Sequence, residues 1–446
     1  MTHSRLAAVP TERWAVAVGL IATFLLTRYI SSLFLGLDEV KFVANDVSYY
    51  GYHLFRLDEG ESGVMVEYPV PAVWILQAIY RLGGGWQTWG ALYVSVFVLL
   101  DALVAITLYR RDNAAGALFW ILFTAAQGPI LWYRFDLIPA ALVAWACLFV
   151  TRFPRVAGAM VGLGAAIKLW PALLIGPMLA PHPWRSARAR GRVIGFAVVG
   201  FGLAAASLIS SGWTRSASPV TWQGQRGLQI ESVPASPLML LRTFTDNPSW
   251  NIFLSPFNAL ELQGPFVEEL LRVSTVLTAL SLATAAYLSY RLIRHLHDDD
   301  ERLHEAILLA ILTIVLATIV TNKTLSPQYI AWLGGPVAAL LVARSSAWLR
   351  RPLIVFSVAL VVVAVLTQMT YPWGAYGIMA IPLGSGPETS VLLLRNLTLV
   401  CLTAYALALT FKASRPFDAL VAGTGSRTSA PGRAAATPVD VGKVSG

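Results

Sequence analysis

Long apolar segments recur along most of the chain and are separated by short polar stretches. Most of these segments approach the roughly 20 residues that an α-helix needs to cross a bilayer. Membrane-spanning helices are therefore predicted at 14–35, 89–109, 114–132, 136–151, 193–211, 272–294, 304–321, 328–343, 352–369 and 390–411. Together with one interrupted segment, the pattern predicts an all-α polytopic membrane protein with about 12 transmembrane helices.

Two apolar segments depart from this pattern. The segment 69–82 contains a proline at its first and third positions and is short for a span. We expect it to lie along the outer membrane face as a short membrane-parallel helix. The segment 156–180 carries Lys168 and Pro171 near its middle, where both residues require a polar recess. It is predicted to form two short helices that meet within the membrane and line a cavity.

The composition agrees with a membrane protein. Of the 446 residues, 56% are hydrophobic and 13% are charged, and the mean hydropathy is +0.63. A soluble enzyme with a single membrane anchor is excluded, because apolar segments extend over nearly the whole chain. The net charge of +9 does not indicate nucleic acid, since the arginines lie in short gaps between apolar segments. Both cysteines, Cys147 and Cys401, lie inside apolar segments, so neither a disulfide framework nor a CxxC metal site is expected.

The positions of the basic residues predict the orientation. Lys and Arg accumulate in cytoplasmic loops of membrane proteins, and basic clusters occur here near Arg188, Arg294, Arg350 and Lys412. We therefore expect a plasma-membrane protein with both termini in the cytoplasm. The predicted organisation is a cytoplasmic N-terminus at 1–13, a transmembrane domain at 14–415, external loops at 38–88, 212–271, 322–328 and 371–389, and a disordered cytoplasmic tail at 416–446.

The first external loop places one acid close to aromatic residues. Seven acids stand against two bases between positions 38 and 68. The candidate site residues in this loop are Asp46, Tyr49, Tyr50, Glu67 and Tyr68. A carboxylate such as Asp46 suits sugar chemistry, because it can accept the proton of an attacking hydroxyl group while aromatic faces pack on sugar rings. The alternative is that Asp46 is one solvated loop acid among the seven.

Three charges near the membrane are candidates for substrate binding. Arg134 and Asp136 lie two residues apart between consecutive apolar segments, where they either bind substrate or form an interfacial ion pair. Lys168 lies within an apolar segment, where its cation requires an anion. A phosphate group would serve, because a lysine ammonium acts on it as a point charge. Pairing with Asp101 would satisfy the same need.

A polar stretch at the predicted loop 322–328 provides further candidates. Ser and Pro residues at 326 and 327 suit the N-cap and first turn of the helix that follows, so capping alone explains them. Capping does not explain why Lys323, Gln328 and Tyr329 occur together. We therefore keep a binding role open for these three residues.

The long external loop 212–271 contains Arg226 and Glu231 among polar and aromatic residues, in the way that saccharide-binding loops do. Ordinary loop composition would produce the same pattern. No metal site is predicted, because the histidine-rich stretch 295–304 lies in a cytoplasmic loop and a solvated charged stretch needs no ligand. The sequence neither demands nor rules out a divalent cation.

These motifs together resemble glycosyltransferase family 87, whose members are lipid-linked sugar transferases of the GT-C superfamily. The family includes mannosyltransferases that use polyprenyl-phosphate-mannose to extend phosphatidylinositol mannosides. The resemblance is carried by Asp46 with Tyr49 and Tyr50, Glu67-Tyr68-Pro69, Arg134-Phe135-Asp136, Lys168-Leu-Trp-Pro171, Arg226 to Ser232, Ser326-Pro327-Gln328-Tyr329 and Leu394-Arg395-Asn396. Their order and spacing along most of the chain make the set specific.

The resemblance implies an inverting transfer on the external face. A hydroxyl group of a glycolipid or glycan acceptor would attack the anomeric carbon of a polyprenyl-phosphate sugar, with Asp46 as the general base. The leaving group is already a phosphate, so no acid has to protonate it, and Lys168, Lys323 and Arg134 would stabilise its charge. The implied partners are the lipid-linked donor, the acceptor and membrane lipids, and no cofactor is implied.

A multi-span transporter of a lipid-linked or small polar substrate is the alternative from another class. The number of spans, a broken helix and intramembrane charges all occur in transporters. The large acidic external loop with its tyrosines and the lack of paired sequence halves favour the transferase.

Overall fold

The computed structural model describes residues 10–297, 302–342 and 345–415. In this part of the chain the helices of the first half are α1 (Pro10–Phe34), α2 (Asn45–Asp58), α3 (Val70–Leu82), α4 (Trp89–Arg110), α5 (Ala114–Gln127), α6 (Ile130–Tyr133), α7 (Leu137–Phe149), α8 (Pro154–Ile167), α9 (Ile175–Met178), α10 (Ala187–Phe196) and α11 (Gly202–Gln225). The second half contains α12 (Ser236–Phe244), β1 (Asn251–Leu254), β2 (Leu260–Gln263), α13 (Val267–His295), α14 (Leu303–Thr321), α15 (Ala331–Val342), α16 (Ala347–Gln368), α17 (Ala375–Ile378) and α18 (Gly386–Ala413). Short 3-10 or π turns lie at η1 (Lys41–Ala44), η2 (Trp170–Leu174), η3 (Ala197–Phe201), η4 (Pro327–Ile330) and η5 (Met369–Trp373).

The helices make this a multi-span membrane protein. Among the described residues, seven helical segments are long and apolar enough to cross a bilayer: Glu12–Phe34, Trp89–Arg110, Ala187–Gln225, Val267–His295, Leu303–Thr321, Ala347–Trp373 and Gly386–Ala413. Shorter apolar helices at Ala114–Gln127, Leu137–Phe149 and Pro154–Ile167 occupy places where the sequence predicts full spans or half-spans. The number of long helices is therefore smaller than the predicted twelve, because several apolar segments break into short helices.

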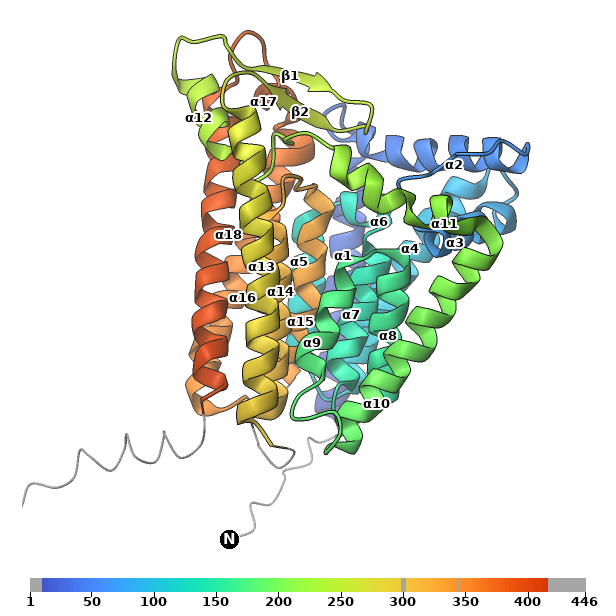
Figure 1. Ribbon diagram of the computed structural model, residues 1–446, viewed down its shortest axis with the longest axis vertical. Helices are drawn as coiled ribbons and strands as arrows, with labels where there is room; N and C mark the ends of the chain where they lie inside the picture. Colours follow the sequence, from blue (N-terminus) through green and yellow to red (C-terminus); the bar gives the residue numbers. More distant parts are fainter. Residues whose placement is uncertain (1–9, 298–301, 343–344, 416–446) are drawn as a thin grey trace, which may run out of the picture. The chain divides into compact units, whose positions relative to one another are not determined.

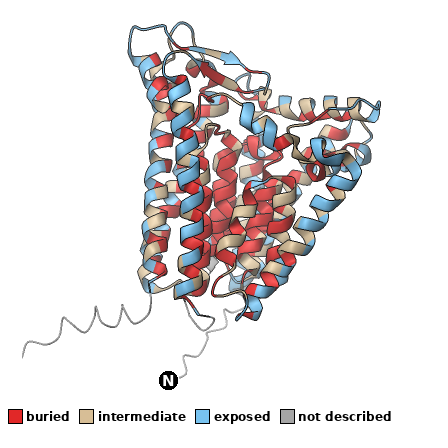
Figure 2. Ribbon diagram, in the orientation of Figure 1, coloured by how far each residue is buried: buried red, intermediate tan, exposed pale blue. Residues whose placement is uncertain are grey.

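Burial differs between the centre and the periphery of the helix bundle. Of the most apolar 18-residue stretch, 83% is buried in Leu303–Thr321 of α14, compared with 11% in Glu12–Phe34 of α1. Figure 2 shows the buried helices in the middle of the bundle and exposed faces on those around them. The exposed faces are apolar, as Leu25 on α1 and Ile354 on α16 illustrate. A bilayer is the environment in which such faces are stable.

The two ends of the bundle differ in their elements (Figure 1). The β1–β2 hairpin, α12 and α2 lie at one end, and α2 runs across the bundle axis. The beginning of α10 and the ends of α13 and α18, which carry basic residues, lie at the opposite end. The basic residues of these three segments therefore lie at one end of the bundle, and the assignment of that end to the cytoplasm stays a prediction.

The two unusual apolar segments form short helices, as predicted. Helix α3 spans Val70–Leu82, which is about 20 Å at 1.5 Å per residue and too short to cross a bilayer. Helix α8 ends at Ile167, and Lys168 is extended (φ −157°, ψ 124°) before the chain turns into η2 and α9. The prediction that the chain breaks near Lys168 and Pro171 is confirmed.

The polar segment after α10 begins at a kink. Gly212 has φ 72° and ψ 174°, a conformation that residues with a Cβ rarely adopt. Helix α11 bends there, and its second part leaves the line of α10 to lie near α3 (Figure 1). This bend coincides with the predicted end of the apolar segment 193–211 and start of the loop 212–271.

The all-α prediction is confirmed for the helix bundle, to which one short hairpin is added. Residues 251–263 form an antiparallel hairpin in which Asn251 pairs with Gln263 and Leu254 with Leu260. An isolated bridge between Gln229 and Glu261 joins this hairpin to the segment that follows α11. The predicted tail 416–446 lies outside the described residues, as do residues 1–9 of the predicted N-terminal segment.

A buried ion pair crosses the bundle between α1 and α4. Arg28 donates to Asp101 through Nε (3.1 Å) and Nη2 (2.6 Å). Asp101 also accepts hydrogen bonds from the indoles of Trp120 (2.8 Å) and Trp132 (3.2 Å). The suggested pairing of Lys168 with Asp101 is therefore wrong, because α1 and α4 both pack against α5 and Arg28 of α1 reaches Asp101 instead.

Candidate active site

A large cavity opens at the end of the bundle that carries α2 and the hairpin. Its volume is about 950 Å³, at the upper end of the range for small-molecule sites. Of the site residues predicted from the sequence, those that line it are Asp46, Tyr49, Tyr50, Glu67, Tyr68, Arg134, Asp136, Lys168, Arg226, Glu231, Gln328 and Tyr329. Six separate stretches of the chain thus bring the predicted residues together, and Lys323 is the one that is not in the lining.

Asp46 lies in the first turn of α2, where the N-terminal end of the helix favours a negative charge. Its carboxylate forms an ion pair with the guanidinium group of Arg134, which stands between α6 and α7. The Arg134 side chain is 11% exposed and that of Asp46 is 20% exposed. Arg134 Nη2 also donates to the hydroxyl of Tyr371 (3.0 Å), whereas its buried Nε has no partner. The pair therefore leaves one N–H donor of Arg134 unused.

Lys168 reaches the same cavity from the break after α8. Its Nζ lies 2.5 Å from Oδ1 of Asp136, the residue at the N-cap position of α7. The indole of Trp332 donates to the same Oδ1 (2.9 Å). Asp136 is almost buried, with a 6% exposed side chain, whereas 26% of the Lys168 side chain is exposed. Of the two side chains, that of Lys168 is therefore the more exposed to the cavity, and Asp136 holds its ammonium group in place.

Aromatic rings surround the Lys168 ammonium group. Trp332 stacks between Trp170 (4.5 Å between centroids) and Tyr329 (4.3 Å). Nζ of Lys168 lies 4.8 Å from the centroid of Tyr329 and 5.3 Å from that of Trp332. Cation–π contacts at such distances stabilise a charge at a partly dehydrated position. The two rings therefore form an aromatic wall beside the Lys168 ammonium group at the cavity.

The tyrosines of α2 pair with residues that precede α3. Tyr49 donates to Glu67 (2.7 Å), and Tyr68 to the hydroxyl of Tyr50 (3.1 Å). Burial, together with the charge of Glu67, raises the pKa of Tyr49. Burial likewise raises the pKa of Tyr68. These hydroxyl groups therefore remain protonated and serve as hydrogen-bond donors rather than as bases.

Glu231 has a partner that the sequence did not reveal. Arg395 on α18 donates to its carboxylate (2.8 Å) and to its carbonyl oxygen (2.6 Å). Burial raises the pKa of Glu231, and the charge of Arg395 opposes this shift. Asn396 adds a bond to the carbonyl of Ser232 (3.3 Å). These contacts attach the segment 226–232 to α18, which explains why the residues at 394–396 accompany the other motifs.

Lys323 is turned away from the cavity. Its Nζ donates to the carbonyl oxygen of Gly224 (2.9 Å) and to that of Arg226. Burial lowers the pKa of Lys323. The lysine thus holds the end of α11 against the start of η4, and it does not extend towards a phosphate in the cavity. Ser326 occupies the N-cap position before Pro327 but makes no capping hydrogen bond through its side chain.

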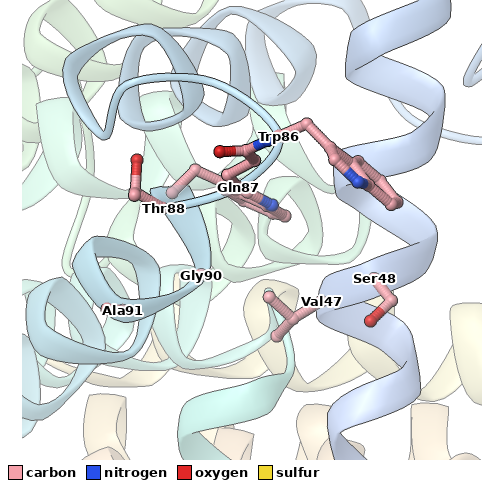
Figure 3. Close-up of a pocket in the computed structure, with 8 residues that line it drawn as sticks. Val47, Ser48, Trp86, Gln87, Thr88, Gly90 and Ala91 are labelled. Carbon is pink, nitrogen blue, oxygen red and sulfur yellow. The ribbon is translucent and has the colours of Figure 1, made fainter.

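A smaller cavity of about 370 Å³ lies between α2 and the loop before α4. Figure 3 shows Val47 and Ser48 on α2 facing Trp86, Gln87 and Thr88 across it. Ser48 and Trp86 line both cavities, so the two adjoin at these residues. No ionisable side chain lines the smaller one. Of the two cavities, only the larger one is therefore lined by ionisable side chains.

Several cavity residues were missed at the sequence level. Tyr371 contacts Arg134 and Trp332 contacts Lys168. Trp332 belongs to the apolar segment 328–343, which was predicted as a membrane helix, and Tyr371 begins the predicted external loop 371–389. Trp222 and Phe257 also line the cavity, from α11 and from the hairpin turn. A Ser-Pro-Phe-Asn turn between alternating apolar residues at 252–262 was a signal for the hairpin. Within the described residues no group of three or more His, Cys, Asp or Glu side chains is placed to hold a metal ion.

The fold and the cavity define a polytopic membrane protein with a large cavity, lined by polar and charged side chains, at one end of its helix bundle. Glycosyltransferase family 87 matches residues 66–318, more than half of the chain. The chain therefore belongs to this family, which is of the GT-C type, and is a membrane-embedded glycosyltransferase. No curated protein and no solved structure matches the chain. Arg134 and Lys168 lie inside the matched range, and Asp46 precedes it.

Proposed function

We propose that the protein transfers a mannosyl residue from a polyprenyl-phosphate donor to a hydroxyl group of a glycolipid or polysaccharide acceptor. The reaction inverts the anomeric carbon, gives an α-linkage and takes place on the extracytoplasmic face of the plasma membrane. One observation carries this proposal. A single cavity of a family 87 chain contains the partly exposed carboxylate of Asp46, at the start of α2, together with the cations Arg134 and Lys168.

The arrangement suits displacement of a phosphate. The acceptor oxygen attacks the anomeric carbon, the bond to the donor phosphate breaks, and the carboxylate of Asp46 takes the hydroxyl proton. Cleavage of this bond converts the phosphate diester of the donor into a polyprenyl phosphate monoester. Arg134 and Lys168 stabilise the negative charge that the phosphate gains. The unpartnered Nε of Arg134 gives it a donor for a phosphate oxygen while other nitrogens remain near Asp46 and Tyr371.

The location of Lys168 explains why such an enzyme is embedded in the membrane. Leu169, the next residue, lines the cavity and is 53% exposed. A prenyl chain attached to a phosphate at Lys168 can pass over Leu169 and the outer surface of α8 into the bilayer. The donor then keeps its tail in lipid while its sugar enters the polar cavity.

The test uses the purified protein with polyprenyl-phosphate-mannose and octyl α-D-mannopyranoside as acceptor. Replacing a general base lowers the rate by about 10² to 10⁴-fold, so Asp46→Asn is expected to lose transfer by this factor. Asp38→Asn is the matched control, because Asp38 lies in the same polar segment, is 87% exposed and does not line the cavity. Full turnover in Asp46→Asn would remove Asp46 from the mechanism.

Membership of a glycosyltransferase family favours the transferase over the transporter. The same purified protein distinguishes the two functions after reconstitution into proteoliposomes loaded with mannoside. A transporter would catalyse counterflow of the mannoside in the absence of the donor. We expect glycosyl transfer and no counterflow. Counterflow in the absence of transfer would support a carrier.

A further inference from the structure

We propose that the part of the cavity between α11 and the hairpin turn is a saccharide subsite, in which a sugar ring of the acceptor rests against Trp222 and Phe257. The inference builds on the proposed function and specifies the acceptor class: a glycan, rather than a simple lipid alcohol. Both aromatic residues line the cavity and are partly exposed to it. Neither belongs to the residues that hold Asp46, Arg134 or Lys168.

The rings of Trp222 and Phe257 already form an aromatic corner in the absence of a ligand. Their centroids are 4.9 Å apart and their planes are nearly perpendicular, at 82°. Phe257 lies in the turn between β1 and β2, and Trp222 lies in the last turns of α11. Each ring restrains the other, and Ala259 and Leu260 of the hairpin extend the apolar wall. Such a corner suits the apolar face of a pyranose ring, which presents C–H groups to an aromatic surface.

A buried amide supplies the polar half of this subsite. Gln229 is only 6% exposed and lines the cavity, yet its Oε1 has no hydrogen-bond partner among the described residues. Its backbone is held by a bond to the carbonyl of Lys323 and by the bridge to Glu261. A buried acceptor without a partner is costly in a folded protein. A sugar hydroxyl entering the cavity would supply the missing donor.

Arg226 offers the complementary group. Its side chain lines the cavity, and its buried Nε has no partner. The guanidinium group has donors but no acceptor, so it requires an oxygen from the ligand. A sugar carries several hydroxyl groups, each of them both a donor and an acceptor, and can therefore donate to Gln229 and accept from Arg226.

The donor and acceptor sites are distinct in their chemistry. The cations that suit a phosphate come from the α6–α7 connection and the break after α8, beside the exposed Leu169. The aromatic corner and the buried amide come from α11, the hairpin and the segment between them. A cavity of about 950 Å³ has room for both ligands. Asp46 lines the same cavity, as an acid that activates the acceptor hydroxyl must.

The experiment measures binding without catalysis. Radiolabelled octyl α-D-mannopyranoside is titrated against the full chain in nanodiscs, with octanol as the competitor that lacks a sugar. Trp222→Ala, Phe257→Ala and Gln229→Leu are each expected to weaken binding by roughly tenfold. Trp222→Phe retains an aromatic face and should keep most of the affinity.

Two variants control for general damage. Trp213 lies on the same helix as Trp222 but is 76% exposed and outside the cavity, and Phe253 lies on β1 of the same hairpin, 41% exposed and outside the cavity. Trp213→Ala and Phe253→Ala should bind the glycoside like the wild type. Unchanged binding by Trp222→Ala and Phe257→Ala, or displacement of the glycoside by octanol, would overturn the proposal.

The same titration separates this inference from the proposed function. Asp46→Asn should bind the glycoside with wild-type affinity although it does not transfer. If the wild type binds the glycoside through Trp222 but never uses a polyprenyl-phosphate donor, the saccharide subsite stands and the proposed reaction is wrong. If transfer to octyl mannoside proceeds and Trp222→Ala leaves its KM unchanged, the reaction stands and the subsite is wrong.

Discussion

Two acids of this chain, Asp101 and Asp136, each pair with a cation within the helix bundle, but their surroundings differ. Asp101 is fully buried, and its carboxylate accepts bonds from Arg28, Trp120 and Trp132. None of these four residues lines the large cavity. Asp136 and its partner Lys168 both line that cavity, and a quarter of the Lys168 side chain is exposed.

The difference shows what an intramembrane charge signifies. Each ionisable group at membrane depth must have a partner, so its presence alone indicates only that a partner exists. The Arg28–Asp101 pair satisfies itself and joins α1, α4 and α5. The Lys168–Asp136 pair leaves the ammonium open to an additional anion. The first pair is therefore expected to affect stability, and the second to affect the donor.

The largest expected change in stability comes from breaking the Arg28–Asp101 pair, called here the enclosed pair. Asp101→Asn leaves Arg28 buried without its counterion and should reduce the free energy of unfolding by about 3 to 5 kcal/mol. Asp112→Asn is the matched control, because the Asp112 side chain is 89% exposed and lies 3.9 Å from Arg13. Thermal unfolding in detergent measures both variants.

The double variant Arg28→Met with Asp101→Leu tests the reason for this loss. Replacing both members of a buried pair by apolar residues can be nearly neutral. The double variant should therefore be nearly as stable as the wild type and should transfer sugar at the wild-type rate. A double variant that regains stability but transfers no sugar would give the enclosed pair a role in the reaction and break the contrast.

The Lys168–Asp136 pair at the cavity should affect donor binding more than stability. Lys168→Met removes a charged hydrogen-bond donor and should raise the KM for the polyprenyl-phosphate donor by roughly 10 to 100-fold. Combining it with Asp136→Asn removes the unpaired carboxylate and should restore stability, but not donor affinity. Recovery of the donor KM in this double variant would show that Lys168 serves only as the partner of Asp136.

The smallest effect is expected at Lys323. Its ammonium bonds backbone carbonyls at the end of α11 instead of facing the cavity. Lys323→Met should lower the free energy of unfolding by about 1 kcal/mol and leave the donor KM unchanged. A donor KM that rises as strongly as in Lys168→Met would return Lys323 to the phosphate site.

Much of the fold follows from the sequence because lipid imposes a simple requirement on it. Apolar length identifies the long helices, and Lys168 with Pro171 marks the break after α8. The hairpin at 251–263 was not predicted, since a short strand pair within a polar loop gives a weak signal beside so many apolar helices. The kink at Gly212 agrees with the end of the apolar pattern.

The candidate site was predictable as a set of residues but not as a set of contacts. Twelve predicted residues line one cavity, because they share the polar end of the bundle. Partners are decided by helix packing across long separations, as in Lys168 with Asp136 and Glu231 with Arg395. A sequence cannot rank Asp101 against Asp136 as the partner of Lys168, nor show that Lys323 points away. Unpartnered buried atoms, such as Oε1 of Gln229, become visible only in three dimensions.

The measurement that tests the central claim most directly is a single-turnover experiment on Asp46→Asn with saturating polyprenyl-phosphate-mannose and octyl mannoside. Donor binding should match the wild type, while the transfer step slows by about 10² to 10⁴-fold. Transfer at the wild-type rate, or a slow step fully explained by lost donor binding, would contradict the assignment of Asp46 as the base.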